Sequence, residues 1–372
     1  MKLFNTDFIL SDRRHGWIDY DRGISIILVT YRHCYESMEK SGLNMHEYPW
    51  LEYINVFFFG FRMPLFFIAS GMFISGSMKK IGLQPYVLNR IKSILYPLLV
   101  WGIIQISLQL IFSDYTNSKG EVDFHSYIYL ITYPRATGQF WYLNALFFVG
   151  VIYAVLKSVF KFTVKYQIAI GVIFYFSCSY LIIHDINVGA ISDILKYYLF
   201  FAIGDAISDF MLSHKTANLF TSRKFIIPLL ILFIIIQYIF TQININNGSN
   251  YFVENKIPIF FLLVALVGCA LSIAVSFSLK KHEALKFIRV IGYNSVHIYC
   301  LQIIVMSISR LVFIKIFGIS NVPLLAFSIL FMGLFVPMVV YNVCLRMNLW
   351  WLFTLKKPEA EISAILGDSS LK

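Results

Sequence analysis

The residues whose types and spacing could do chemistry begin with Asp19, Arg22, His33 and Glu36 near the N-terminus. On an α-helix, the eleven steps from Arg22 to His33 turn about 1,100°, or about 20° past three full turns, so the two share a face. Asp19 lies about 40° from His33 on the same side, and Glu36 follows three residues later and can contact it. A helix here therefore presents one polar stripe, with Arg22 and His33 about 16 Å apart along its axis.

An imidazole on this stripe can act as a general base, because neutral histidine can take the proton of an attacking hydroxyl. Glu36, or another carboxylate such as Asp19, would orient His33. Alternatively, His33 acts as a nucleophile and carries an acyl group itself. The structural alternative is a polar residue at a helix end, placed at the outer membrane interface.

Further candidates lie in apolar segments later in the chain. Arg62 stands several residues inside an apolar run, where arginine needs a partner. It could bind an acyl oxygen, a phosphate or a carboxylate, or it could form an ion pair between two helices. Asn294 and Gln302 belong to a polar segment, where hydrogen bonds between helices are the structural alternative. Arg62 and Asn294 are candidate donors to an oxyanion. Trp141 suits either stacking on a sugar or the membrane interface.

Three cations, Arg22, Arg90 and Lys92, lie at the predicted cytoplasmic edge of apolar segments. They could hold the phosphate groups of a molecule such as coenzyme A. The alternative is ordinary anchoring by basic residues on the cytoplasmic side of a membrane.

The composition requires a lipid environment for the elements that position these residues. Of the 372 residues, 58% are hydrophobic and only 14% are charged, whereas a soluble domain carries roughly 25% charged residues. The net charge of +11 comes from short basic clusters between apolar runs, which favours membrane orientation over nucleic-acid binding. The five cysteines are widely spaced, so we interpret them as small buried side chains, with no metal site expected.

Ten apolar segments approach the length of about 20 residues that a transmembrane helix needs. They are 17–35, 55–76, 93–112, 140–156, 167–184, 193–212, 225–241, 257–279, 291–309 and 323–345. The first and sixth are the most polar, and the sixth contains Lys196 and Asp205, which should face protein. The sequence thus predicts an all-α bundle of about ten transmembrane helices.

The basic residues also predict an orientation. Most of the 31 lysines and arginines fall in alternate loops, which become cytoplasmic if the N-terminus is inside. Both termini are then cytoplasmic. We expect one membrane-embedded domain over residues 1–355, followed by a short polar cytoplasmic tail over 356–372.

An ordered set of motifs resembles the acyltransferase-3 family of membrane proteins, and most of all its fucose 4-O-acetylase-like branch. The motifs are Asp19-Tyr20-Asp21-Arg22-Gly23 followed by His33, Met63-Pro64-Leu65-Phe66-Phe67 with Ser70-Gly71, the basic segment that ends at Pro97, Phe140-Trp141-Tyr142-Leu143, Gly292-Tyr293-Asn294-Ser295, and Ile298-Tyr299. The chain departs from the family pattern at Arg62, Ile94 and Gln302, where histidine, arginine and histidine are usual.

The resemblance implies an O-acyltransferase that takes an acyl group, often acetyl, from cytoplasmic acyl-coenzyme A. The acceptor would be a hydroxyl of a cell-surface glycan or a lipid-linked sugar precursor, and the membrane a bacterial inner membrane. The resemblance also implies an essential His33, with Arg22 and Arg90 serving the donor. The alternatives are a transporter or exporter of a glycan or lipid-linked sugar without acyl transfer, and a sensor or scaffold without catalysis.

Overall fold

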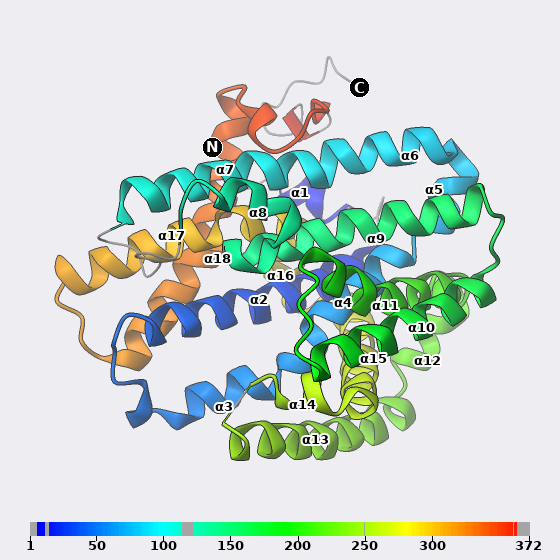
Figure 1. Cartoon of the computed structure of the whole chain (residues 1–372), viewed down its shortest axis with the longest axis horizontal. Coiled ribbons are helices and arrows are strands. Elements are labelled where there is room, and N and C mark those ends of the chain that lie inside the picture. The colour runs from blue at the N-terminus through cyan, green and yellow to red at the C-terminus, as the bar shows by residue number, and fades with distance from the viewer. Residues whose placement is uncertain (1–5, 12–14, 114–121, 249, 360, 363–372) are drawn as a thin grey trace. The chain divides into compact units, whose positions relative to one another are not determined.

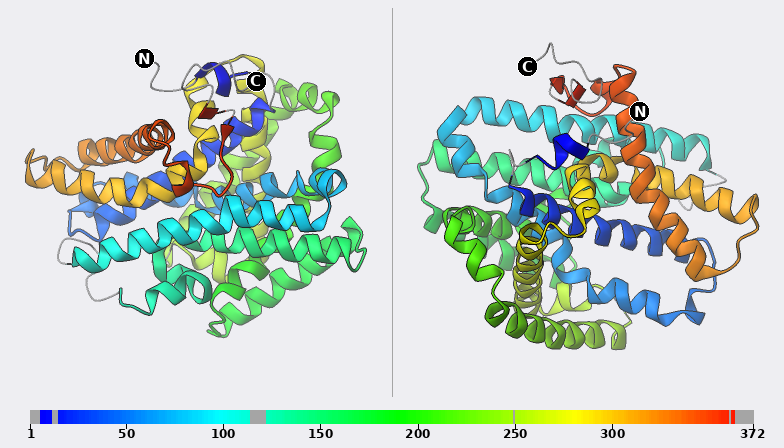
Figure 2. Two further views of the ribbon diagram at one scale, coloured as in Figure 1. Left: turned by 90° about the horizontal axis from the view of Figure 1, so that it is seen from above. Right: turned by 180° about the vertical axis from the view of Figure 1, so that it is seen from behind.

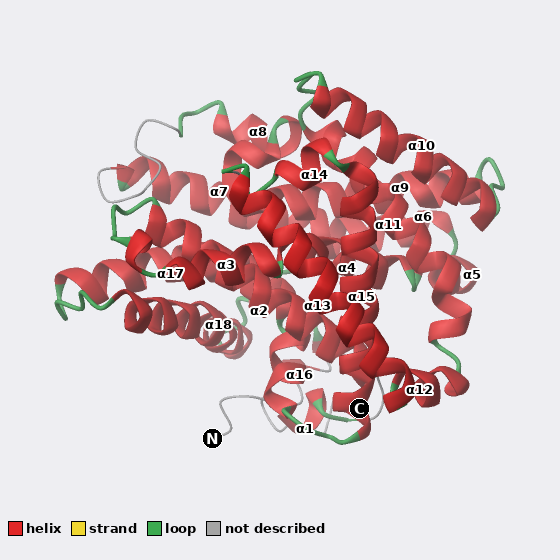
Figure 3. Cartoon of the chain, turned by 90° about the horizontal axis from the view of Figure 1, so that it is seen from below, coloured by secondary structure: helices red, strands yellow, loops and turns green. Residues whose placement is uncertain are grey.

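The computed structural model describes residues 6–11, 15–113, 122–248, 250–359 and 361–362. Within this part of the chain, every regular element is a helix (Figures 1 and 3). The chain forms two compact units, each assembled from segments that are distant in sequence. Unit 1 comprises Met1–Asn55, Tyr96–Tyr129 and Leu285–Lys372, and unit 2 comprises Val56–Leu95 and Leu130–Ala284.

Unit 1 is built around α2, which packs against α16, α17 and α18. Helices α17 and α18 run side by side (Figures 1 and 2), and α7 also contacts α17. The helices of this unit are α1 (Thr6–Ile9), α2 (Gly16–Glu39), α7 (Tyr96–Ile111), α16 (Lys286–Tyr293), α17 (Ser295–Lys315) and α18 (Val322–Arg346), with short 3₁₀ turns at Met45–Glu47 (η1) and Trp350–Leu352 (η5). Helices α3 (Pro49–Phe57) and α8 (Ser126–Thr132) begin in unit 1 and end in unit 2.

Local sequence explains where these helices begin. The side chain of Asn321 caps α18 by accepting a hydrogen bond of 2.9 Å from the Leu324 amide. Proline follows in the first turn of α18, where its missing N–H costs nothing. Around the C-terminal half of α2, buried apolar residues from α2, α3, α17 and α18 form a continuous core that includes Cys34, Met38, Leu51, Met306, Leu325 and Ile329.

Unit 2 is organised around α11, which packs against α4, α9 and α10. Its helices are α4 (Phe59–Gly71), α5 (Ile74–Ile81), α6 (Leu83–Arg90), α9 (Trp141–Ser158), α10 (Val164–Ile183), α11 (Ala190–Met211), α12 (His214–Phe220), α13 (Arg223–Asn246), α14 (Phe252–Lys256) and α15 (Pro258–Lys281), with a 3₁₀ segment at Pro134–Phe140 (η4). A β-carbon on Gly71 would lie 2.0 Å from the Phe201 carbonyl oxygen. This glycine therefore allows α4 and α11 to pack closely.

A single π-helical turn, η2 (Ile91–Leu95), follows Arg90 and leads directly into α7. Pro97 stands in the first turn of α7, and a proline inside a helix removes a hydrogen bond and crowds the carbonyl four residues earlier. A wider turn relieves that crowding. Turns of this kind are also frequent at functional sites.

Eight helical segments of the described chain are long and apolar enough to cross a membrane. The two remaining predicted spans coincide with α2 (24 residues) and α11 (22 residues), which are long enough to cross roughly 30 Å but contain more charged residues. On α11, Lys196 and Asp205 are 5% and 4% exposed. They pair with Glu254 at 2.7 Å and with Lys157 at 2.6 Å, so the prediction that they face protein is confirmed.

The predicted all-α, multi-pass membrane architecture is confirmed. All five cysteines are free and buried, as predicted. The cytoplasmic location of the termini stays a prediction. Of the predicted tail, residues 356–359 and 361–362 are described, and residues 360 and 363–372 lie outside the described part of the chain.

Candidate active site

The polar stripe of α2 holds His33 beside Glu36. The Nδ1 atom of His33 lies 3.5 Å from Oε2 of Glu36, and the two side chains are 15% and 35% exposed. This is the i, i+3 contact that the helical spacing predicts. The distance exceeds that of a good hydrogen bond, and catalytic hydrogen bonds are often long before substrate binds. A carboxylate on Nδ1 favours the tautomer in which Nε2 can accept a proton.

Arg32 completes this group, and sequence reasoning did not single it out. Its Nε donates a hydrogen bond of 2.6 Å to Oε1 of Glu36. The Glu36 carboxylate therefore receives Arg32 on one oxygen and faces His33 with the other. This arrangement holds the carboxylate in place and offsets its charge. The i, i+4 spacing of Arg32 and Glu36 is the signal that would have predicted the pair.

Four further contacts fix the part of α2 that carries His33. Thr30 Oγ1 donates to Gln302 Oε1 at 2.6 Å, and Gln302 is fully buried on α17. The hydroxyl of Tyr31 donates to the Leu51 carbonyl at 2.8 Å. The remaining contacts are Cys34 Sγ to the Ala326 carbonyl at 3.4 Å and Arg310 Nη1 to Ser37 Oγ at 2.8 Å. His33 therefore stands on a backbone that is tied to α3, α17 and α18.

Asp19 has a different partner from the one its position on the stripe suggested. It is 2% exposed, and its Oδ2 lies 3.6 Å from Nε of Arg289 on α16. Fourteen residues separate Asp19 from His33, or about 21 Å along the helix, so Asp19 does not orient that ring. Arg289 is fully buried and also donates to the carbonyls of Leu10 at 3.2 Å and Ser11 at 3.0 Å. It thereby holds the N-terminal segment against α16.

The first motif of the resemblance and the motif that begins at Gly292 meet where α2 crosses α16. A β-carbon on Gly292 would lie 1.7 Å from the Asp19 carbonyl oxygen, and one on Gly23 would lie 2.2 Å from the Ile288 carbonyl oxygen. Both positions therefore require glycine. One turn beyond Asp19, Arg22 is partly exposed at the same end of α2.

Asn294 lies at the break between α16 and α17 and is 2% exposed. Its Nδ2 donates to the Val290 carbonyl at 2.9 Å, which satisfies the end of α16. This bond takes one of the two N–H groups of the amide that the sequence put forward as an oxyanion donor. Asn294 therefore helps to terminate α16 in the described structure.

In unit 2, Arg62 is 1% exposed on α4, and its guanidinium carbon lies 4.9 Å from the centre of the Phe59 ring. Arg90 Nε donates to the Tyr86 hydroxyl at 2.8 Å. A β-carbon on Gly150 would lie 2.9 Å from the guanidinium carbon of Arg90. Arg90 therefore packs against α6 and α9 of this unit and stays partly exposed. Lys92, within the π-helical turn, is partly exposed.

Trp141 at the start of α9 is also partly exposed. The guanidinium carbon of Arg135 lies 4.3 Å from the centre of the indole, and the Tyr197 ring lies 5.4 Å away. Arg135 is itself paired with Asp193 at 2.6 Å. The indole thus has a cation on one face, an arrangement that stabilises both partners.

Comparison with protein families decides which of the sequence interpretations holds. The acyltransferase-3 family model, described as an acyltransferase domain, matches residues 15–342. The chain belongs to the acyltransferase-3 family. The match runs from the residue before α2 almost to the end of α18, so it contains every candidate residue. Comparison with curated proteins gave no match, and comparison with solved structures gave none.

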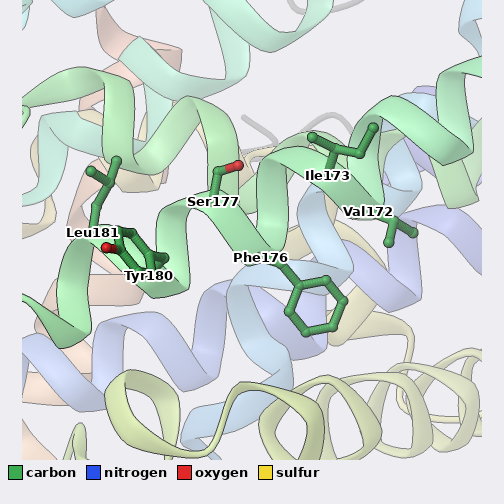
Figure 4. A pocket seen from close by; sticks show the side chains of 6 residues that line it. All are labelled: Val172, Ile173, Phe176, Ser177, Tyr180 and Leu181. Atoms are coloured by element: carbon green, nitrogen blue, oxygen red, sulfur yellow. The ribbon is translucent and has the colours of Figure 1, made fainter.

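The protein is therefore a multi-pass membrane acyltransferase, and the transporter interpretation is not favoured. No group of three or more metal-ligand side chains occurs among the described residues. A hollow along the outside of α10 is lined by Val172, Ile173, Phe176, Ser177, Tyr180 and Leu181 (Figure 4). This hollow comes from one helix and contains none of the candidate residues, so it suits contact with lipid rather than catalysis.

Proposed function

We propose that this acyltransferase moves an acetyl group from cytoplasmic acyl-coenzyme A to a hydroxyl of a cell-surface glycan or lipid-linked sugar precursor. Its membrane would be a bacterial inner membrane, and the chain would belong to the fucose 4-O-acetylase-like branch of the family. Family membership supports acyl transfer. The identities of the acyl donor, of the acceptor and of the membrane are what we propose.

The observation that carries the proposal is the His33 and Glu36 pair, whose Nδ1 and Oε2 atoms lie 3.5 Å apart. A neutral imidazole held in one tautomer by a carboxylate is the usual general base for an attacking hydroxyl. The pair is supported by Arg32, which contacts the other carboxylate oxygen at 2.6 Å. A histidine that merely lies at the membrane interface does not require a carboxylate beside its ring or an arginine beside that carboxylate.

In the proposed reaction, the acceptor hydroxyl oxygen attacks the thioester carbonyl while His33 Nε2 takes the hydroxyl proton. The tetrahedral intermediate then expels the coenzyme A thiolate, which takes that proton from the imidazolium. An ester and free coenzyme A result. If His33 instead carries the acyl group, its Nε2 attacks the thioester, the coenzyme A thiolate leaves and takes the Nδ1 proton, and the hydroxyl then attacks the acyl-imidazole, returning its proton to the released imidazole.

Arg22 is our first candidate for the phosphates of the donor, because it is partly exposed on the stripe that carries His33. The helix spacing puts it about 16 Å from His33 along α2. Arg90 and Lys92, at and just after the end of α6, are the further candidates. Trp141 is our candidate for contact with the sugar.

The test is transfer of label from radiolabelled acetyl-coenzyme A to extracted host glycan by protein in nanodiscs. Wild-type protein should transfer label, and His33→Ala should lose about 10²- to 10⁴-fold in rate. His46→Ala is a matched control, because His46 is exposed in the turn at Met45–Glu47. Transfer that survives His33→Ala would remove this residue from the mechanism. Wild-type protein that neither transfers nor hydrolyses any acyl donor would contradict the proposed reaction.

A further inference from the structure

The chain folds back on itself after α18 and covers one end of unit 1. Asn348 adopts a left-handed conformation with φ of 59°, and the Leu349 amide donates to the Cys344 carbonyl at 2.7 Å, which ends the helix. The following segment contacts α7 and α18, and is drawn in red in Figure 1. We call its described residues, 350–359 and 361–362, the C-terminal strap.

Phe353 attaches the strap to a group of aromatic side chains. It is 4% exposed, and its ring centre lies 5.1 Å from Trp101, 5.3 Å from His297 and 5.0 Å from Tyr341. The rings of His297 and Tyr341 are stacked, with centres 3.5 Å apart. The residues Trp101, His297 and Tyr341, from α7, α17 and α18, form what we call the aromatic box.

The box contains polar atoms that Phe353 does not satisfy. Trp101 is 6% exposed, and its buried Nε1 has no hydrogen-bond partner among the described residues. The buried Nδ1 of His297 likewise has none in the described part of the chain. Buried polar groups are normally paired, so unpaired ones inside an aromatic group call for an explanation. A phenyl ring supplies stacking but neither a donor nor an acceptor.

The strap is also held by one specific hydrogen bond. The Tyr341 hydroxyl donates to Oε2 of Glu361 at 2.7 Å. The same tyrosine thus forms a wall of the box and fastens the segment that covers it. Trp351 and Leu355 remain 48% and 49% exposed, whereas Phe353 and Ile362 are buried. The strap is therefore attached through Phe353, Ile362 and the hydrogen bond of Glu361.

A purine base matches the chemistry of the box. Its flat face stacks on aromatic rings, which contributes strongly to binding of bases in general. Its ring nitrogens accept hydrogen bonds, as the indole N–H of Trp101 requires, and its amino group can donate to His297 Nδ1. Of the parts of an acyl-coenzyme A donor, only the adenine has this combination of a flat ring, acceptors and a donor.

We infer that the aromatic box binds the adenine base of the donor and that the C-terminal strap closes it, with Phe353 in the place of the base. This inference rests on the proposed function, because it takes acyl-coenzyme A as the donor. The donor would bind only those molecules in which the strap is open. Its apparent affinity would therefore be the intrinsic affinity multiplied by that open fraction. Release of Phe353 and of the bond between Tyr341 and Glu361 would open the site.

The experiment measures binding to the full chain in nanodiscs by calorimetry. The probe is adenosine 3′,5′-bisphosphate, the nucleotide part of coenzyme A, and phosphopantetheine, which lacks the base, is the comparison. Phe353→Ala should lower the Kd of the nucleotide by about tenfold if the closed state predominates in the wild type. Tyr341→Phe keeps the ring and removes the bond to Glu361, so it should lower this Kd several-fold. Trp351→Ala, an exposed aromatic on the same turn, should leave it unchanged.

Trp101→Phe in the Phe353→Ala background should weaken nucleotide binding again, because the ring remains and the N–H is lost. Phosphopantetheine should bind all variants alike. Unchanged nucleotide affinity in both Phe353→Ala and Tyr341→Phe would overturn the inference, as would an equal gain for phosphopantetheine. If wild-type protein transfers label but the Kd of the nucleotide is the same in wild type, Phe353→Ala and Tyr341→Phe, then only the inference about the strap and the aromatic box is contradicted. If nucleotide binding responds as expected but no label moves, the proposed reaction alone is contradicted.

Discussion

The main-chain carbonyl of Asp19 packs directly against the α-carbon of Gly292, so that a β-carbon there would lie only 1.7 Å from the carbonyl oxygen. Two motifs that lie more than 250 residues apart in the chain are thereby in backbone contact. This contact fixes the position at which α2, which carries the polar stripe, packs against α16.

Gly292→Ala should therefore lower the free energy of unfolding by about 1–3 kcal/mol or more, because the added methyl group must push two backbones apart. Thermal unfolding in detergent would measure this as a lower transition temperature. Gly76→Ala is the control, since a β-carbon on Gly76 in α5 meets nothing within 4 Å. That substitution should be neutral or slightly stabilising, because alanine favours helix. Equal transition temperatures for the two variants would contradict the close crossing.

Glu36→Gln should lower kcat by about tenfold, while the KM for the donor changes little, because the carboxylate orients His33 without binding substrate. Arg32→Gln should have a smaller effect, since Arg32 acts on His33 through Glu36. The double variant should be no worse than Glu36→Gln alone, the non-additivity expected of residues in one network. Kinetics of label transfer test all three. Additive losses would show that Arg32 acts independently.

Arg22→Gln should raise the KM for acyl-coenzyme A by about tenfold or more, as expected when a charge-assisted hydrogen bond is lost. Its kcat at saturating donor should fall much less. Added salt should weaken donor binding to the wild type more than to the variant. Lys79→Gln, which removes an exposed cation at the end of α5, is the control. A normal KM in Arg22→Gln would remove this residue from the donor site.

Lys196→Met should destabilise unit 2 by about 3–5 kcal/mol, because it leaves the carboxylate of Glu254 buried without its cation. The two side chains are 7% and 4% exposed and 2.7 Å apart. Adding Glu254→Leu should restore much of the lost stability. Lys280→Met is the control, since its pair with Glu283 is partly exposed and should contribute only about 0–1 kcal/mol. Thermal unfolding of the three variants, compared with the wild type, tests this prediction. Failure of the double variant to recover would assign Lys196 another role.

Several features followed from the sequence because they depend on local rules. Apolar runs of about 20 residues predict membrane-crossing helices, since backbone polar groups must be satisfied within the segment in lipid. The contact of His33 with Glu36 followed from their spacing of three residues on one helix. The ordered motifs led to the family, and the family to acyl transfer. The polar residues of α11 were expected to face protein, because lipid does not accept Lys196 or Asp205.

Only the tertiary structure could show which distant residues meet. Helical spacing placed Asp19 on the same stripe as His33, but its partner, Arg289, is 270 residues away in the chain. The contact of Thr30 with Gln302 and that of Tyr341 with Glu361 likewise depend on how helices pack or how the chain turns back. A polar side chain in an apolar segment indicates that a partner is needed, and it does not identify the partner.

The sequence by itself therefore determined the fold class, the family and the catalytic candidate, because hydropathy, helical spacing and motif order are properties of the chain. The tertiary structure decided that Gly23 and Gly292 form a helix crossing, that Asn294 ends a helix, and that Phe353 fills an aromatic box. These outcomes depend on the packing of side chains that are distant in sequence. Each such contact is set by the three-dimensional arrangement of several helices at once, and no periodicity along the chain encodes it.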